Sequence, residues 1–160
     1  MDKLTLYTPK CTLVPAHFFE PASSREILGE VVVLDADDVV RYIEVPQYDA
    51  VLVYAVADKD VNAVPELYEV LRLLPSCPEY NKILASWKEG YLVLAIAEGG
   101  SLKLANVYSA PDFTTAEYYI FLALKSLQLN LEVSTITWRS EIGAEDEMSL
   151  YRYFKSVDRI

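Results

Sequence analysis

The chain has few of the residues on which catalytic and metal sites depend. Its 160 residues include two cysteines, Cys11 and Cys77, and a single histidine, His17. The cysteines lie far apart and lack CxxC spacing, which favours two idle thiols over a disulfide or a metal pair. A Ser-His or Cys-His nucleophile would have to use His17, and Cys11 is six residues away. The neighbours of His17 in the sequence are apolar, so we favour a packing role for it.

Long apolar runs and clusters of positive charge are also missing. No apolar run approaches the roughly 20 residues that span a bilayer, and residues 1–5 lack the pattern of a secretory signal. The 14 Lys and Arg residues are outnumbered by 24 Asp and Glu, which gives a net charge of −10. Such a chain repels phosphate backbones. We therefore expect a cytoplasmic protein that does not insert into membranes and does not bind nucleic acid.

The sequence is rich in apolar residues, which make up 52% of the chain. A chain of this length can bury roughly 68–70% of its unfolded surface, which supports a substantial core. The second half predicts three consecutive strands over residues 82–87, 91–97 and 101–108. Glycines at the two tips, Gly90 and Gly99, supply the positive φ that tight hairpins need. The middle strand is apolar on both faces, as expected of a central strand.

A helix is predicted after these strands. Thr114 and Glu117 match a capping box, so the helix should begin there, and Glu117 is explained as its cap. Apolar residues at helical spacing then form one inward face: Ala116, Tyr119, Ile120, Ala123, Leu124 and Leu127. Residues 132–138 alternate Val133 and Ile136 with polar residues and predict a fourth strand. An acidic loop over 141–147 and a final helix over 148–157 complete this half.

The first half is less regular. Proline positions suggest one strand over residues 4–14 broken at Pro9, followed by short helices from residue 15 and residue 23. Further strands are predicted over 31–34 and 50–56, with a weaker one over 39–45, and a helix over 58–74. The stretch Pro75–Pro78 interrupts that helix. We place a domain boundary there, giving parts 1–78 and 79–160, unless the two form one compact unit.

Several mostly apolar segments occur in an order typical of known proteins. They are Thr12–Pro15 with Phe18 and Phe19, Ala50–Tyr54, Gly100–Asn106, and Tyr118 and Tyr119 with Leu124 and Leu127. The stretch Val51–Glu141 resembles the second half of actin-like proteins of the pilus-assembly and cell-division type. A closer resemblance is to an uncharacterised bacterial family with an actin-like ATPase fold (domain of unknown function 3822). It implies an α/β or α+β fold of the ribonuclease H-like, actin-like kind, and no known activity.

The sequence departs from the actin-like pattern where nucleotide would bind. Actin-like sites place an Asp-x-Gly turn between the first two strands of each meander, where backbone amides hold phosphate. The corresponding segment here, Ser86–Gly90, has no aspartate, contains the bulky Trp87, and has adjacent opposite charges at Lys88 and Glu89. We therefore expect a degenerate site without cofactor or metal. If a nucleotide does bind, Lys88 and Gly90 are the candidate residues.

A second departure is length. A complete first actin-like lobe needs its own meander and helix, so the chain is a fragment or a shortened member, or its first half is built differently. A partial sheet would leave an edge and an apolar face to be covered. This motivates a hypothesis of self-association or a protein partner.

The sequence supports neither of two possible kinds of metal site. Asp35, Asp37 and Asp38 do not follow the EF-hand pattern, and we favour a solvated loop over a cation site. A ribonuclease H-like nuclease needs a carboxylate on its first strand to hold metal ions, and residues 83–87 contain none. No metal ligands are therefore assigned.

Tyrosine is abundant, with 12 residues. Aromatic residues are enriched in interface cores, so some of these could form a binding surface: Tyr42, Tyr48, Tyr80, Tyr91 and Tyr108. Tyrosine also has high strand propensity. We therefore favour core or sheet-face positions for most of them.

The sequence thus favours a non-catalytic interaction or scaffold module over an enzyme. The alternative is a divergent ATP-binding protein whose site is completed by a second chain, with Lys88, Lys103 and Arg139 contacting phosphate. A metal-dependent nuclease is a third hypothesis, against which the acidic charge already counts.

Overall fold

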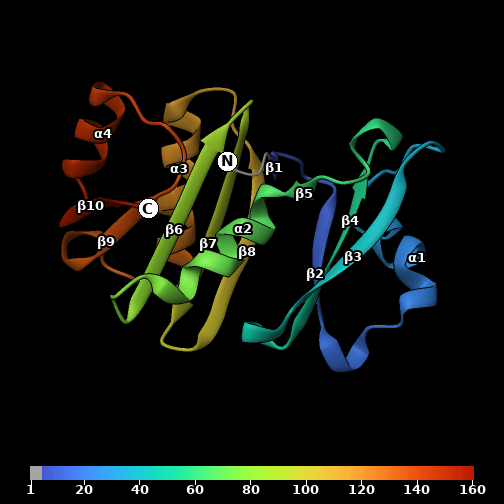
Figure 1. The fold of residues 1–160 in the computed structure, drawn as a ribbon. Coiled ribbons are helices and arrows are strands. Elements are labelled where there is room, and N and C mark those ends of the chain that lie inside the picture. The colour runs from blue at the N-terminus through green and yellow to red at the C-terminus, as the bar shows by residue number, and fades with distance from the viewer. Residues whose placement is uncertain (1–4) are drawn as a thin grey trace.

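The computed structural model describes residues 5–160, and most of its strands belong to two sheets (Figure 1). The larger sheet has the order β10-β9-β6-β7-β8. Strands β6, β7 and β8 form an antiparallel meander, whereas β9 runs parallel to β6 and β10 runs parallel to β9. The bounds of these strands are β6 Asn81–Lys88, β7 Tyr91–Glu98, β8 Ser101–Ser109, β9 Thr135–Trp138 and β10 Ser156–Arg159.

The smaller sheet is antiparallel and has the order β2-β4-β3. Its strands are β2 (Cys11–Pro15), β3 (Val39–Val45) and the fully buried β4 (Ala50–Val56). A separate parallel pair joins β1 (Thr5–Leu6) to β5 (Val64–Pro65). This pair brings the start of the described chain to the N-terminus of the next helix.

Helices and sheets alternate in layers across the molecule (Figure 1). Helix α2 (Glu66–Leu73) packs between the two sheets. Helices α3 (Phe113–Ser126) and α4 (Ala144–Tyr151) cover the opposite face of the larger sheet. Helix α1 (Ser24–Gly29) covers the outer face of the smaller sheet, where Leu28 contacts the odd-numbered residues of β4.

The meander forms as predicted. Residues Leu92–Ala97 of β7 are all buried, because this strand has α3 on one face and α2 on the other. At the β6–β7 tip, Glu89 and Gly90 both have positive φ, 56° and 82°, so Lys88 and Tyr91 pair across a two-residue turn. Such a turn matches the twist of the flanking strands.

The predicted capping box of α3 is wrong. Asp112 caps the helix, since its carboxylate accepts a hydrogen bond from the Thr115 backbone N–H at 2.7 Å. Thr114 therefore lies within the first turn. Glu117 is not a cap either, because it accepts a hydrogen bond from the Ser149 hydroxyl of α4 at 2.8 Å. The inward face of α3 is confirmed at Ala116, Ile120, Ala123 and Leu124, which are buried.

Two predictions in the first half need correction, and one is strengthened. Residues 31–34 are not a strand, because the N–H groups of Val31 and Val32 donate to the Leu28 carbonyl at the end of α1. The chain over 5–15 is not one strand, because its two pieces pair with β5 and β4; Leu4 lies outside the described residues. The weak strand over 39–45 is a complete strand, β3.

The predicted helices were shifted or too long. Asp58–Asp60 is a single 3₁₀ turn, and α2 begins only at Glu66, because Val64 and Pro65 pair with β1. The first predicted helix is a single 3₁₀ turn, Ala16–Phe18, whereas the second is confirmed as α1.

Near the C-terminus, the predicted strand over 132–138 begins only at Thr135, and Val133 is exposed on a 3₁₀ turn. The acidic loop ends at Gly143, because Ala144–Glu147 form the first turn of α4. That helix ends at Tyr151, and residues 156–159 form strand β10. Periodicity was misleading here, because the buried side chains of Phe154 and Val157 mimic a helical face.

The predicted boundary at residue 78 stays a prediction. The apolar cluster around α2 joins side chains from both parts, since Leu52 and Leu71 lie in the same cluster as Leu84 and Val93. The two predicted parts therefore share a packed interior.

Candidate functional site

Polar side chains meet where the parallel strands β6 and β9 end. Ser86 lies on the side of β6 that faces α2, two residues after Leu84, which packs against that helix. Arg139 follows β9 directly, and its N–H donates to the Ala85 carbonyl at 2.9 Å. The carboxyl ends of parallel strands are where ligands of α/β proteins commonly bind. This end of the sheet is the candidate functional site.

Glu66 occupies the centre of this site. It is the first residue of α2, and only 1% of it is exposed. One carboxylate oxygen, Oε2, accepts hydrogen bonds from Ser86 Oγ at 2.6 Å and from Arg139 Nε at 2.9 Å. The other, Oε1, accepts from the Thr5 hydroxyl. A buried carboxylate is costly without such partners, and its negative charge also suits the N-terminus of a helix.

Tyr7 closes the cluster from the N-terminal segment. Its hydroxyl donates to Glu66 Oε2 at 2.9 Å and lies 2.5 Å from Ser86 Oγ. Burial raises the pKa of Tyr7 far above its ordinary value, so the phenol keeps its proton at neutral pH. Each hydroxyl has a single proton to donate. The donor capacity of Tyr7 and Ser86 is therefore used up within this cluster.

A pocket of about 420 Å³ opens beside the cluster. Tyr7 forms part of its wall, and the other lining residues are Trp87, Lys88, Glu89, Ser140 and Glu141. The wall at Trp87 is fixed by hydrogen bonds, because its backbone N–H donates to Ser140 Oγ at 2.9 Å and its indole N–H donates to the Ala110 carbonyl at 2.8 Å. The pocket thus lies at the turn where the sequence pointed to a degenerate nucleotide site.

The structure places Lys88 in this pocket and Gly90 at the adjoining turn. Lys88, Glu89 and Glu141 are all exposed, so the lining carries two carboxylates and one ammonium group. The carbonyl of Gly90 accepts a hydrogen bond from the Ala110 N–H at 2.8 Å, which ties the turn to the end of β8. Gly90 thus supplies the shape of the turn, and Lys88 supplies its one positive charge.

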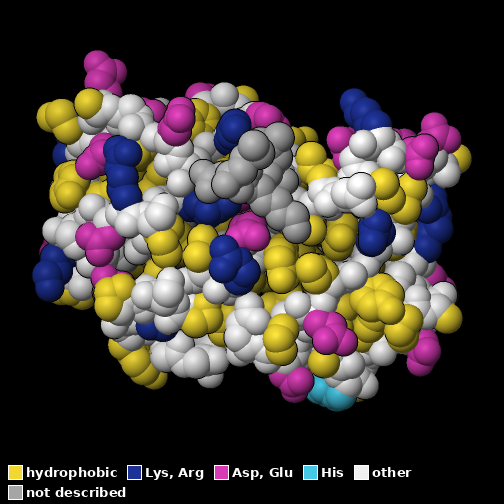
Figure 2. All heavy atoms as spheres, viewed as in Figure 1, with side chains coloured by type: hydrophobic (Ala, Val, Ile, Leu, Met, Phe, Trp, Pro, Cys, Tyr) yellow, Lys and Arg dark blue, Asp and Glu magenta, His cyan; other side chains and the backbone are white. Residues whose placement is uncertain are grey.

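The other two cations considered for phosphate lie elsewhere. The guanidinium of Arg139 is paired with the buried Glu66. Lys103 is exposed on β8 and does not line the pocket. The three basic residues therefore do not form one cluster. On the face seen in Figure 2, Lys and Arg side chains are scattered.

The acidic stretch after α1 is engaged by basic side chains. Lys10 Nζ lies 3.2 Å from Asp35 and 2.7 Å from Asp38, and Arg25 donates to the backbone carbonyls of both residues. Asp37 is exposed. Within residues 5–160, no group of three or more His, Cys, Asp or Glu side chains is arranged to hold a metal ion.

The cysteine and histidine side chains also lack a catalytic arrangement among the described residues. Burial raises the pKa of the Cys11 thiol to about 12 and also raises that of Cys77, so both stay protonated. Both thiols are free, as predicted. His17 is exposed and packs against the ring of Phe18, with ring centroids 4.1 Å apart.

The five tyrosines considered for a binding surface divide into two groups. Tyr48 packs at the α2 cluster, Tyr108 stacks on Tyr119 of α3 at 4.7 Å, and Tyr91 is half-buried. Tyr42 and Tyr80 are exposed. Tyr48 belongs to a core cluster, and Tyr42, Tyr91 and Tyr108 lie on strands, so the core or sheet-face interpretation holds for four of the five.

Comparison with known proteins agrees with the fold predicted from the sequence. A family model described as a protein of unknown function (DUF3822) matches residues 3–157. A crystal structure of a Bacteroides thetaiotaomicron protein, described as having an actin-like ATPase fold and unknown function, is similar with a TM-score of 0.79 and 16% sequence identity. The alignment covers 96% of this chain and 65% of the other, so the chain spans less than two thirds of that protein.

This likeness shows an actin-like fold built from mixed α and β elements. A search of curated protein sequences found no match. Among the described residues, no helix combines the length and the apolar character that crossing a membrane requires.

Proposed function

The chain belongs to the family of proteins of unknown function DUF3822, and from this premise we propose that it is a non-catalytic interaction or scaffold module with a degenerate nucleotide site. The observation that supports this proposal is the lining of the pocket at the β6–β7 turn, where Glu89 and Glu141 outnumber Lys88. A nucleoside triphosphate would bring several more negative charges to this place. Like charges within a few ångströms repel one another.

The surrounding groups offer little compensation. Arg139 does not line the pocket, and its Nε is engaged by the buried carboxylate of Glu66. Drawing the guanidinium toward phosphate would weaken that ion pair and leave a buried carboxylate less well compensated. The turn itself consists of only Glu89 and Gly90, so it presents few backbone amides to an anion. Both arguments favour a site that has lost its affinity for nucleotide.

A divergent ATP-binding protein is the second candidate. It is favoured by the position of Lys88, which lines a pocket of about 420 Å³ at the expected turn. The phosphate contacts that this chain lacks would then come from a second chain.

Titration calorimetry with Mg²⁺-ATP separates the two candidates. We expect no binding heat for the wild type under the proposed function. If nucleotide does bind, Lys88→Glu should abolish the affinity, whereas Lys103→Glu, the same charge reversal outside the pocket, should leave it unchanged. Nucleotide binding with that pattern would overturn the proposal.

The proposal includes a cytoplasmic location and a protein partner, either another protein or a second copy of this chain. The choice of a protein as the partner is supported by the net charge of −10, because this charge disfavours binding to nucleic acid and to anionic membranes.

A further inference from the structure

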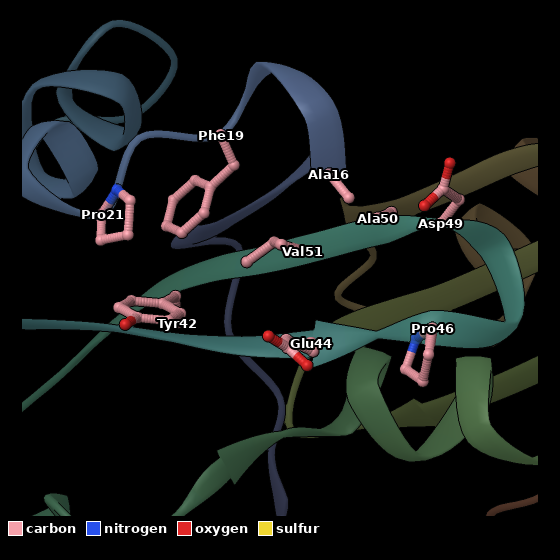
Figure 3. A pocket seen from close by; sticks show the side chains of 9 residues that line it. All are labelled: Ala16, Phe19, Pro21, Tyr42, Glu44, Pro46, Asp49, Ala50 and Val51. Atoms are coloured by element: carbon pink, nitrogen blue, oxygen red, sulfur yellow. The ribbon is translucent and has the colours of Figure 1, made fainter.

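A groove of about 360 Å³ lies on the outer face of the smaller sheet, away from α2 (Figure 3). The β3–β4 hairpin forms the floor of the groove, and the segment between β2 and α1 forms its wall. The lining residues include Phe19, Tyr42, Glu44, Asp49 and Val51. Figure 3 shows Phe19 pointing from its loop toward the strand that carries Val51.

The groove is held in shape by the backbone. The Ala16 N–H donates to the Asp49 carbonyl at 2.9 Å, which ties the loop to the tip of the hairpin. The Phe19 N–H donates to the Ala16 carbonyl at 3.2 Å and closes a 3₁₀ turn. The groove is therefore preformed, which lowers the entropic cost of binding.

Aromatic rings line one end of the groove. Phe19 and Tyr42 are in contact, with ring centroids 4.9 Å apart, and 48% of Tyr42 is exposed. The neighbouring Phe18 is 72% exposed. In Figure 2, hydrophobic side chains gather over the lower part of β3 and the adjoining loop. Exposed aromatic rings side by side are typical of a recognition surface.

The charge of the groove is uniformly negative. Its charged lining residues are Glu44 and Asp49, and neither carboxylate forms an ion pair with the rest of the described chain. Glu44 lies two residues from Tyr42 on β3 and therefore on the same face of the sheet. A carboxylate on the same face as an aromatic ring suits a cation, because the ring attracts positive charge and the carboxylate accepts its hydrogen bonds.

We propose that this groove binds an arginine side chain on a basic segment of a partner protein. The planar guanidinium stacks on aromatic rings and forms paired hydrogen bonds with a carboxylate, which a lysine ammonium cannot do equally well. A second copy of this chain is disfavoured as the occupant, because both copies carry a net charge of −10. The inference rests on the proposed interaction function and specifies the chemistry of the partner.

An NMR titration with N-acetyl-argininamide tests the assignment, with N-acetyl-citrullinamide as the uncharged analogue. The arginine probe should shift the amide signals of residues 16–21, 42–44 and 49–51, and the citrulline probe should bind at least about tenfold more weakly, since hydrogen bonds to charged groups are worth about 1.5–3 kcal/mol. Equal shifts from both probes, shifts elsewhere on the surface, or no shift at tens of millimolar would overturn the assignment.

Two variants, with one control, test whether the residues of the groove bind the arginine probe. Glu44→Gln should weaken arginine binding about tenfold, whereas Glu132→Gln removes an exposed carboxylate at a distant 3₁₀ turn and should change nothing. Phe19→Leu keeps an apolar side chain and should also weaken binding. An equal loss in Glu44→Gln and Glu132→Gln would show only the general attraction of an acidic protein for a cation, and would refute the groove.

Two further measurements separate this inference from the proposed function. Light scattering that found a dimer, with groove signals dependent on protein concentration, would make a second copy the occupant and refute the arginine assignment. Binding of Mg²⁺-ATP would overturn the proposed function, whereas loss of the arginine response alone would overturn only the groove.

Discussion

Replacement of Glu66 by glutamine tests the polar cluster at the ends of β6 and β9. The substitution keeps the shape of the side chain and one oxygen acceptor, but it removes the negative charge that compensates Arg139. It also places an NH₂ group where a carboxylate oxygen accepts hydrogen bonds from Tyr7, Ser86 or Thr5. The hydroxyl donors of these residues would then face the NH₂ group of the glutamine, which is itself a donor, in a site that is almost completely buried.

The size of the effect follows from the burial of the two partners. Glu66 is 1% exposed, but 26% of the Arg139 side chain reaches solvent and can regain hydration. Fully buried pairs lose about 3–5 kcal/mol when one partner is removed, whereas surface pairs lose about 0–1 kcal/mol. We expect Glu66→Gln to cost about 2–3 kcal/mol, which corresponds to a fall in Tm of about 4–12 °C at this chain length.

Urea unfolding, followed by tryptophan fluorescence, measures this cost. Glu69→Gln is a matched control, because Glu69 lies on the same helix and pairs with the exposed Arg72; its loss should stay below about 1 kcal/mol. In a double-mutant cycle with Arg139→Met, the coupling energy should be about 1–2 kcal/mol. Additivity within about 0.5 kcal/mol would refute the argument, because that is the behaviour of independent sites.

Two further predictions concern hydrogen bonds elsewhere. Trp87→Phe should cost about 1–3 kcal/mol, since it leaves the buried carbonyl of Ala110 without its donor. Trp138→Phe should cost about 1 kcal/mol or less, because the buried indole N–H has no acceptor among the described residues and its removal offsets the lost volume; in urea unfolding, a larger loss for Trp138→Phe than for Trp87→Phe would contradict this. The hydrogen bond from Lys10 lowers the pKa of Asp38 below its ordinary 3.8, so its contribution to stability is present above that pH and is lost as the pH falls through the lowered pKa. Asp38→Asn should therefore flatten the acid end of the stability profile in a series of urea titrations, and an unchanged slope would disprove the role of this pair.

The antiparallel meander could be predicted because its signals are local. Strand length, glycine at the tips and the apolar run of β7 all lie within residues 82–108, and neighbouring strands in the sequence also pair in space. The short parallel strands β5 and β10 could not be predicted in this way, and neither could the pairing of β1 with β5, although the extended conformation of β1 was predicted. Each of these strands has only two to four residues and depends on a partner that is distant in the sequence. Apolar residues at helical spacing therefore led to predicted helices that wrongly included β5 and the segment before β10.

Only part of the candidate site could be predicted from the sequence. The turn at Lys88 and Gly90 was identified, because a hairpin tip is a local feature. Glu66 was missed, because a helix predicted from Asp58 placed it in the middle of a helix instead of at the buried N-terminus of α2. Its partners Tyr7 and Arg139 lie 59 and 73 residues away, so only the folded chain brings them together. The one local signal was a glutamate directly after Pro65, a pairing common at helix starts.

The most direct test of the account is the thermal unfolding of the protein with and without Mg²⁺-ATP. A ligand present at 100 times its dissociation constant adds about 2.7 kcal/mol of stability, which would raise Tm by roughly 5–11 °C for a chain of this size. The account predicts an unchanged midpoint, because Glu89 and Glu141 line the pocket at the β6–β7 turn and Arg139 is paired with Glu66. A rise of several degrees that disappears in Lys88→Glu would contradict it and establish a divergent nucleotide-binding protein.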